Sequence, residues 1–311
     1  MAPWRTHFSR FFQIPPFHNN LHYEVIYFDS TSAKKMNVKV SYFSTPDQVP
    51  LVDVTVSDPP RVAVVIDVLR ATTTITALLE NGAEAVETFD DINLLKQAAS
   101  LWQGERLLVG ERGGIMIEGF DLGNSPVAMA QANVAGKRIF MSTTNGTRAL
   151  AKVRNHVPCV YCACLPNRQA VSERIIAVLC EGDTQSHETS HVWIIGSGGE
   201  GKFSLEDTFC AGSVASALLE RAVQTVPTTI TMDIQPANDD MVAAMAVWEC
   251  YKKNPESCLR KASHGKSLTT IMSQQEADAD FKACAALDVS EVIPEQSGPG
   301  VLKLQTNRKG S

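Results

Sequence analysis

The sequence predicts an α/β protein of three layers, α/β/α, in which helices cover both faces of a mainly parallel or mixed sheet. Two observations support this fold class. Continuous apolar runs, which are typical of buried strands, alternate with segments of helical periodicity along most of the chain. Three of these runs end abruptly in turns rich in glycine, hydroxyl and charged residues, and a helical pattern follows each turn. Because the three units could form a weak internal repeat, the prediction also allows two similar lobes.

The apolar runs and the periodic segments place the elements in order along the chain. Strands are expected at residues 38–43, 62–66, 85–88, 106–109, 139–142, 159–163, 192–195 and 228–232. Helices are expected at residues 73–81, 91–102, near 147, 169–180, 205–222 and 240–252. Residues 1–35 have no convincing periodicity, and Met36 would be a natural start of translation. We therefore interpret residues 1–35 as a poorly ordered N-terminal extension and residues 36–311 as the folded domain.

The composition is that of an ordinary globular enzyme, with 311 residues, 44% of them hydrophobic and 20% charged. A net charge of −6 argues against a general surface for nucleic acid or an anionic membrane, because both require a positive face. Apolar runs fall short of the ~20 residues that span a bilayer, and we find no secretory signal pattern. We therefore expect a cytoplasmic protein with reduced cysteines, and a homodimer is a common state for enzymes of this size.

The first strand–turn–helix unit contains the sequence DVLRATTTI at residues 67–75. A helix that begins directly after a buried strand presents unpaired N–H groups and the positive end of its dipole, so the junction can bind an anion. Asp67 and Arg70 lie where open α/β sheets place reactive groups. Hydroxyls that could contact an anion come from Thr72, Thr73 and Thr74. A capped helix with a surface Asp–Arg pair would show the same residue types.

The second unit, TTNGTRAL at residues 143–150, repeats this logic. An Asn-Gly pair usually indicates a hairpin, but here a strand precedes it and a helical pattern follows. The candidate anion-binding residues are Asn145, Gly146, Thr147 and Arg148.

The third unit, GSGGEGKFSLED at residues 196–207, resembles a phosphate-binding loop in composition. It matches neither the nucleotide P-loop nor the dinucleotide fingerprint. Gly198 and Gly199 could approach a ligand closely. Glu206 and Asp207 form the acidic first turn of a helix, and paired carboxylates beside a glycine loop could equally hold a metal ion.

A glycine-rich loop at residues 110–126 adds further candidates. Glu111 and Asp121 could reach a hard cation such as Mg²⁺, which prefers oxygen ligands, and Arg112 lies beside them. The alternative is a surface turn, although a loop of this length is usually functional or disordered. Weaker candidates are Asn167, which follows an apolar run, and His264, in a predicted polar turn between helices.

Taken in order, DVLRATTTI, GERGGIMIEGFDLGNSP, TTNGTRAL, LPNR, GSGGEGKFSLEDTFCAG and SHGKSL resemble the 2-phosphosulfolactate phosphatase (ComB) family, from about Met36 to Leu304. The resemblance implies an α/β fold particular to that family and a phosphatase catalytic domain at residues 36–311. It also implies a Mg²⁺-dependent phosphoric monoester hydrolase that converts 2-phosphosulfolactate to 3-sulfolactate and phosphate on a route to coenzyme M. The partner would be a small anionic phosphorylated substrate.

The resemblance, together with the position of the motifs, suggests roles for the candidates. Catalytic roles fall to Asp67, Arg70, Glu111, Arg112 and Asp207. Substrate binding falls to Thr72, Thr73, Thr74, Asn145, Gly146, Thr147, Arg148, Asn167, Gly198, Gly199 and His264. The candidate Mg²⁺ ligands are Glu111, Asp121, Glu206 and Asp207, and spacing does not select among them.

Three alternatives stay open at this point. Asp67 could attack phosphorus to form an aspartyl-phosphate, or it could bind Mg²⁺ and orient the attacking water. We favour the second route, because Leu69 stands where a DxD-type phosphatase has its second Asp. The substrate could be another phosphorylated 2-hydroxy acid, and the protein could bind an organophosphate without turnover. The acidic residues in the candidate loops argue against a protein that only binds an anion, because a carboxylate facing an anionic ligand gives no favourable interaction.

Overall fold

The computed structural model describes residues 34–50, 59–181, 189–227 and 229–305. Apart from Lys34 and Lys35, the predicted N-terminal extension lies outside the described residues. The strands are β1 (Lys34–Phe43), β2 (Val62–Ile66), β3 (Ala85–Thr88), β4 (Arg106–Arg112), β5 (Ile115–Met116), β6 (Arg138–Ser142), β7 (Cys159–Ala163), β8 (Thr189–Gly196), β9 (Ile230–Pro236), β10 (Ile293–Gly298) and β11 (Val301–Gln305).

The α-helices connect these strands. They are α1 (Ala71–Glu80), α2 (Ile92–Leu101), α3 (Pro126–Gln131), α4 (Gly146–Val153), α5 (Arg168–Glu181), α6 (Leu205–Thr225), α7 (Asp239–Tyr251), α8 (Pro255–Lys261), α9 (Ser263–Ile271) and α10 (Gln274–Ala285). In the described part of the chain, no helix is both long and apolar enough to cross a lipid bilayer.

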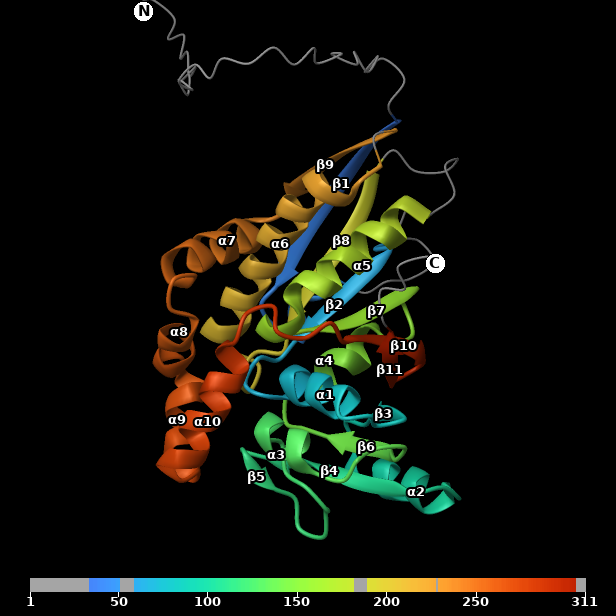
Figure 1. Cartoon of the computed structure of the whole chain (residues 1–311), viewed down its shortest axis with the longest axis vertical. Coiled ribbons are helices and arrows are strands. Elements are labelled where there is room, and N and C mark those ends of the chain that lie inside the picture. Colours follow the sequence, from blue (N-terminus) through green and yellow to red (C-terminus); the bar gives the residue numbers. More distant parts are fainter. Residues whose placement is uncertain (1–33, 51–58, 182–188, 228, 306–311) are drawn as a thin grey trace, which may run out of the picture.

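A mixed, mostly parallel sheet forms the centre of the molecule, which confirms the predicted fold class (Figure 1). Within the described residues it has eleven strands in the order β5-β4-β6-β3-β11-β10-β7-β2-β8-β1-β9. One parallel block contains β7, β2, β8, β1 and β9, and another contains β3, β6 and β4. The C-terminal hairpin β10–β11 joins the two blocks through antiparallel pairs with β7 and β3. The predicted strands therefore form two unequal parallel blocks, and the hairpin between them was not predicted.

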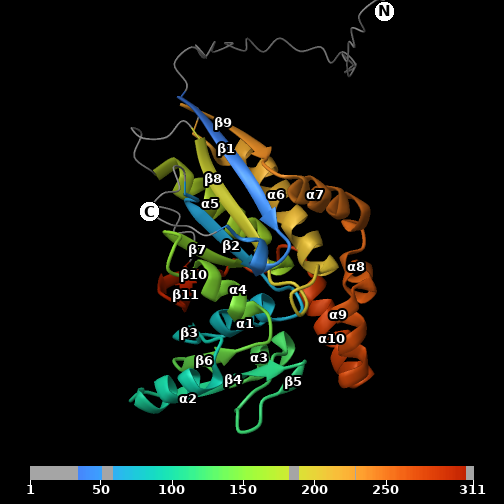
Figure 2. The same cartoon turned by 180° about the vertical axis from the view of Figure 1, so that it is seen from behind.

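Helices cover both faces of the larger block because its strands are apolar on both sides. In β2, Val62, Val64 and Ile66 pack against the apolar faces of α5 and α6. Ala63 and Val65 point to the opposite face, where they share a core with α1 and α4 (Figure 2). This alternation is the period-two pattern of a strand buried on both faces.

The segment α8–α10, which we call the helical cap, lies beside the carboxyl ends of the parallel strands (Figures 1 and 2). Cys258, Leu268, Phe281 and Cys284 of the cap are buried and belong to the main core. Gly265 permits close packing within the cap, since a Cβ there would lie 2.0 Å from the carbonyl oxygen of Leu259. The cap is therefore a fixed wall at the edge of the sheet where α/β proteins bind ligands.

Candidate functional site

A cavity of about 580 Å³ opens between the carboxyl ends of β4, β6 and β8 and the helical cap. One wall is the turn between β6 and α4, with Thr144 and Asn145. The loop from Gly199 to Glu206 forms a second wall, and cap residues that include His264 form a third. The second and third predicted junctions therefore meet at one cavity, and Glu111 at the end of β4 joins them.

Glu111 links the end of β4 to the turn before α4. Its Oε1 accepts a hydrogen bond from the Thr144 N–H at 2.7 Å, and its Oε2 accepts one from the Thr144 hydroxyl at 3.0 Å. The Gly114 N–H donates to Oε2 at 2.6 Å. Both carboxylate oxygens are thus engaged by chain groups, so Glu111 holds two walls of the cavity together.

Asp67 lies directly behind the start of α4. A Cβ at Gly146 would lie 2.5 Å from the Ala71 Cβ and 2.8 Å from Asp67 Oδ2, so only glycine allows this approach. Asp67 Oδ1 accepts a hydrogen bond from the Ala71 N–H at 3.0 Å, and Oδ2 has no donor among the described residues. The first junction therefore contacts the second through Asp67, although Asp67 itself does not line the cavity.

Burial raises the pKa of Asp67 to about 6. The charge of His264 and the hydrogen bond from Ala71 oppose this rise, whereas the carboxylates of Glu111 and Glu206 add to it. A carboxyl group with a pKa near 6 can exchange a proton near neutral pH, which is the property required of an acid or base catalyst.

Asp207 ties the first junction to the third. Its Oδ1 accepts from the Val68 N–H at 3.0 Å, and its Oδ2 accepts from the Gly198 N–H at 3.1 Å. Burial raises the pKa of Asp207 well above its ordinary value, and the neighbouring Glu206 and Asp67 raise it further. Because both oxygens are engaged by backbone N–H groups, the structure gives this predicted catalytic residue a positioning role.

Glu206 and His264 form an acid–imidazole pair at the cavity. Glu206 Oε1 lies 3.7 Å from His264 Nδ1, and the Glu206 side chain is buried. His264 lies in the first turn of α9 rather than in the predicted polar turn, and this places its ring in the cavity wall. Glu206 is positioned to orient the imidazole ring.

The threonine hydroxyls of the first junction have backbone partners. Thr72 donates to the Asp67 carbonyl oxygen at 2.9 Å, and Thr73 donates to the Val68 carbonyl oxygen at 2.9 Å. Thr74 donates to the Asn124 carbonyl oxygen at 3.2 Å. All three threonines are buried outside the cavity, so the structure supports a role in shaping the turn rather than the expected contact with an anion.

Thr147 and Asn167 are likewise internal. The Thr147 hydroxyl donates to the Thr143 carbonyl oxygen at 2.9 Å and closes the first turn of α4. The Asn167 side-chain amide is fully buried and donates to the Val292 carbonyl oxygen at 3.0 Å. The structure does not bring either side chain to the cavity.

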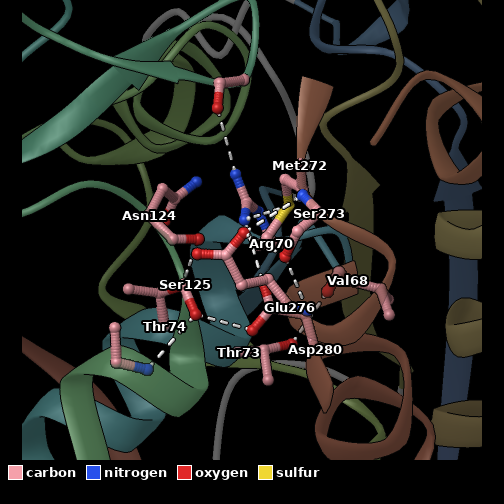
Figure 3. Close-up of polar contacts among 12 residues, drawn as sticks. Val68, Arg70, Thr73, Thr74, Asn124, Ser125, Met272, Ser273, Glu276 and Asp280 are labelled. Carbon is pink, nitrogen blue, oxygen red and sulfur yellow. Dashed lines mark hydrogen bonds and ion pairs between the residues drawn. The ribbon is translucent and has the colours of Figure 1, made fainter. Parts of the chain in front are cut away.

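Arg70 does not line the cavity, and it pairs with Asp280 of the cap (Figure 3). Its Nη1 lies 2.8 Å from Asp280 Oδ2, and only 4% and 3% of the two side chains are exposed. Asp280 Oδ1 accepts a hydrogen bond from the Ser125 hydroxyl at 2.6 Å, and Arg70 Nη2 donates to the Gly114 carbonyl oxygen at 3.4 Å. The pair therefore fastens α10 to the β2–α1 turn and to the cavity wall at Gly114.

Three further candidates lie outside the cavity. Arg112 donates to the Glu111 carbonyl oxygen at 2.7 Å and to the Ser142 hydroxyl at 2.8 Å, which stabilises the end of β4. Arg148 is exposed on α4. Asp121 accepts from the Leu108 N–H at 2.7 Å and lines a separate depression with Arg106, so it is not grouped with Glu111 as a metal ligand.

Sequence reasoning missed Lys261 and Phe203. Both line the cavity together with Lys202, and Phe203 has 60% of its surface exposed. Asp280 could have been found from the sequence, because this acidic residue interrupts the apolar stripe of α10 between Ala277 and Cys284. An acidic residue on such a stripe needs a buried partner.

The family resemblance implies Mg²⁺, and the carboxylates near the cavity show which residues could hold this ion. Within the described ranges, no group of three or more His, Cys, Asp or Glu side chains could hold a metal ion. Glu111 and Asp207 have both oxygens engaged, whereas Asp67 Oδ2 and the Glu206 carboxylate accept no hydrogen bond from the described residues. Mg²⁺ is commonly held by one or two carboxylates together with substrate phosphate and water, and Asp67 and Glu206 fit that arrangement.

Comparison with known proteins supports one family. A family model described as 2-phosphosulpholactate phosphatase matches residues 45–299. A protein from Synechococcus sp. (strain CC9605), named "Probable 2-phosphosulfolactate phosphatase", is 49% identical over 267 residues, which cover 86% of this chain and 99% of that protein. Proteins with the same name from Prochlorococcus marinus (strain MIT 9313) and Cyanothece sp. (strain PCC 7425 / ATCC 29141) are 50% and 42% identical. The matches cover 78% of this chain and 92% of the Prochlorococcus protein, and 85% of this chain and 99% of the Cyanothece protein.

Proposed function

This chain belongs to the 2-phosphosulfolactate phosphatase family, and on that basis we propose that it hydrolyses 2-phosphosulfolactate to 3-sulfolactate and phosphate. The observation that carries the proposal is that the turn before α4, the loop from Gly199 and the Glu206–His264 pair meet at one cavity, with Asp67 directly behind the start of α4. The reaction is the hydrolysis of a phosphoric monoester, and its product lies on a route to coenzyme M, as the family resemblance implies.

The phosphate binds at the start of α4. The Gly146 N–H has no acceptor among the described residues, and it carries the positive end of the α4 dipole. Asn145 and Thr144 line the cavity at the same turn, and Glu111 holds that turn in place. Gly199 contributes a wall without a side chain, which leaves room for the phosphate oxygens.

Proton transfer is divided between Asp67 and His264. A bond forms between a water oxygen and phosphorus while the ester bond between phosphorus and the 2-oxygen breaks. The Asp67 carboxylate accepts the proton of the water, and the His264 imidazolium donates a proton to the departing 2-oxygen. Glu206 orients the imidazole ring during this transfer.

Asp67 and Glu206 would hold Mg²⁺, and the ion would offset the charge of the phosphate oxygens. The remaining chemistry depends on the side chains and amides of the chain itself. Asp207 and Arg70 support it indirectly, because they fix the β2–α1 turn that carries Asp67.

The direct test measures phosphate released from 2-phosphosulfolactate by the purified full-length protein, with added Mg²⁺ and with EDTA. We expect stoichiometric phosphate and 3-sulfolactate, and we expect EDTA to remove the activity. Faster release from 2-phospholactate would support the alternative substrate class. Binding of 2-phosphosulfolactate without phosphate release would contradict the proposal and support a non-catalytic binding protein.

Rapid quenching with labelled substrate separates the two routes through Asp67. The water route predicts no phosphoprotein at any time. An acid-stable phosphoprotein that hydroxylamine cleaves would show that Asp67 attacks phosphorus instead.

A further inference from the structure

Asn145 directly precedes α4, but its side chain does not cap that helix. An asparagine at this position usually accepts a hydrogen bond from an N–H of the first helical turn. Asn238 before α7 and Asn254 before α8 do so, each with the N–H three residues later at 3.1 Å. Asn145 makes no such bond, and the Gly146 N–H has no acceptor among the described residues. The asparagine at the cavity is therefore directed away from its own helix.

The side-chain oxygen of Asn145 holds the neighbouring glycine loop. Its Oδ1 accepts the N–H of Glu200, 55 positions later, at 3.2 Å. Glu200 and Gly201 form the tip of a tight turn, which is closed by two hydrogen bonds between Gly199 and Lys202, both at 2.9 Å. The φ angle is +52° at Glu200 and +76° at Gly201, a pair of values typical of glycine or asparagine in hairpin turns. Glu200 holds this conformation against its own preference, and the bond to Asn145 fixes the tip of the turn.

The hydrogen bond to Glu200 also decides which end of the Asn145 amide faces the cavity. Only the oxygen can accept an N–H, so Oδ1 lies toward the turn and Nδ2 is the opposite end of the amide. Nδ2 has no acceptor among the described residues, and it is not one of the atoms sealed from solvent. Asn145 lines the cavity and only 8% of it is exposed. The donors of Nδ2 are therefore open to the cavity, and the open Gly146 N–H follows in the chain.

We propose that Asn145 is a catalytic residue that donates a hydrogen bond from Nδ2 to an oxygen of the transferred phosphoryl group. The inference rests on the proposed function, in which the phosphate binds at the start of α4. A donor whose direction is fixed before the substrate binds stabilises the charge of the transition state without reorganisation. Glu200 is the positioning residue of this pair, because it acts through its backbone N–H and sets the direction of the Asn145 amide.

The substitution Asn145→Asp separates the two ends of the amide. Aspartate keeps an oxygen for the Glu200 N–H, but it replaces the Nδ2 donor by a second oxygen that repels phosphate. We expect kcat for phosphate release from 2-phosphosulfolactate to fall roughly 10²–10³-fold, as is typical when one preorganised donor is removed. Asn145→Ala loses both ends and should lose kcat to a similar extent. Both variants should give the circular dichroism spectrum of the unaltered protein, because Glu111 and Asp207 still hold the two loops.

The matched control is Asn254→Asp, which makes the same chemical change at the start of α8. Asn254 is exposed and lies outside the cavity, so kcat should stay within about threefold of the unaltered value. Equilibrium titration with inorganic phosphate gives a second readout that does not need turnover. The unaltered protein and the control should bind phosphate equally, and Asn145→Asp should bind it at least about tenfold more weakly.

A purely structural role of Asn145 predicts a different pattern. If the side chain only docks the Glu200 turn, Asn145→Asp keeps the unaltered kcat and Asn145→Ala alone loses activity, and this result would overturn the proposal. Equal phosphate affinity in Asn145→Asp and the control would overturn it as well. Failure of the proposed function looks different, because the unaltered protein would then release no phosphate from 2-phosphosulfolactate while its affinity for inorganic phosphate still depended on Asn145.

Discussion

Replacing Asp280 by asparagine should destabilise the protein strongly, because it leaves the Arg70 guanidinium without a counter-charge. The two side chains are almost completely buried, and their atoms lie 2.8 Å apart. Asp280 also accepts the Ser125 hydroxyl, so its loss weakens the contact between α10 and α3 as well. An asparagine can still accept one hydrogen bond but carries no charge.

The size of the effect follows from burial. Removing one partner of a buried ion pair costs about 3–5 kcal/mol, and the retained hydrogen bond places Asp280→Asn near the lower end, at about 3 kcal/mol. Folded domains are stable by about 5–15 kcal/mol, so this is a large fraction of the total. An additional Arg70→Met substitution should recover part of the loss, because it removes the uncompensated charge.

Urea unfolding followed by circular dichroism measures this free energy of unfolding. Asp278→Asn is the matched control, because Asp278 lies on the same helix and pairs with Arg260 at the solvent-exposed surface. We expect the control to unfold close to the unaltered midpoint. Two results would refute the assignment of a buried charge pair. One is a fall of less than about 1 kcal/mol in the free energy of unfolding for Asp280→Asn, and the other is a lower free energy of unfolding when Arg70→Met is added to it.

Two further substitutions test the Asp67–Gly146 contact. Burial raises the pKa of Asp67 from 3.8 to about 6, so the folded protein holds the proton of this carboxyl group more tightly than the unfolded chain does. The protonated carboxyl group therefore stabilises the fold at low pH, and this stabilisation is lost as pH rises through about 6. Asp67→Asn should therefore raise the free energy of unfolding at pH 8 by up to about 3 kcal/mol, which corresponds to about two pKa units, and leave it unchanged at pH 3. The same substitution should abolish phosphate release. An equal gain in stability at both pH values would show that the raised pKa of Asp67 is not the cause. Gly146→Ala should lower kcat/KM by roughly 100-fold and destabilise by about 1–3 kcal/mol, because the new Cβ would meet Ala71 and Asp67. Gly298→Ala, where a Cβ meets nothing within 4 Å, is its control in the same unfolding and activity assays, and equal behaviour of the two variants would contradict the steric argument.

The sequence predicted the strands of the parallel blocks well because their signal is local. The run at residues 62–66 is apolar at every position, as a strand buried on both faces must be, and it forms β2. The second and third junctions meet at one cavity because the parallel strands that precede them end at the same edge of the sheet. The hairpin β10–β11 carried no such signal, and its place between β3 and β7 depends on pairing with strands more than 130 residues earlier.

The roles of individual side chains were harder to predict, because they depend on contacts distant in sequence. Arg70 pairs with Asp280, which lies 210 positions later, and no local pattern links the two. The hydroxyls of Thr72 and Thr73 contact backbone oxygens five positions earlier, a choice that depends on the geometry of the turn. His264 could be selected only weakly, since its relation to Glu206 exists only after the cap has packed.

We propose that the phosphate ester is cleaved in the cavity at the Glu206–His264 pair. Steady-state phosphate release from 2-phosphosulfolactate by His264→Gln tests it most directly, with unfolding measured in parallel. We predict a fall in kcat of roughly 10²–10⁴-fold with an unfolding midpoint close to that of the unaltered protein. Phosphate release by His264→Gln at the unaltered rate would contradict the claim.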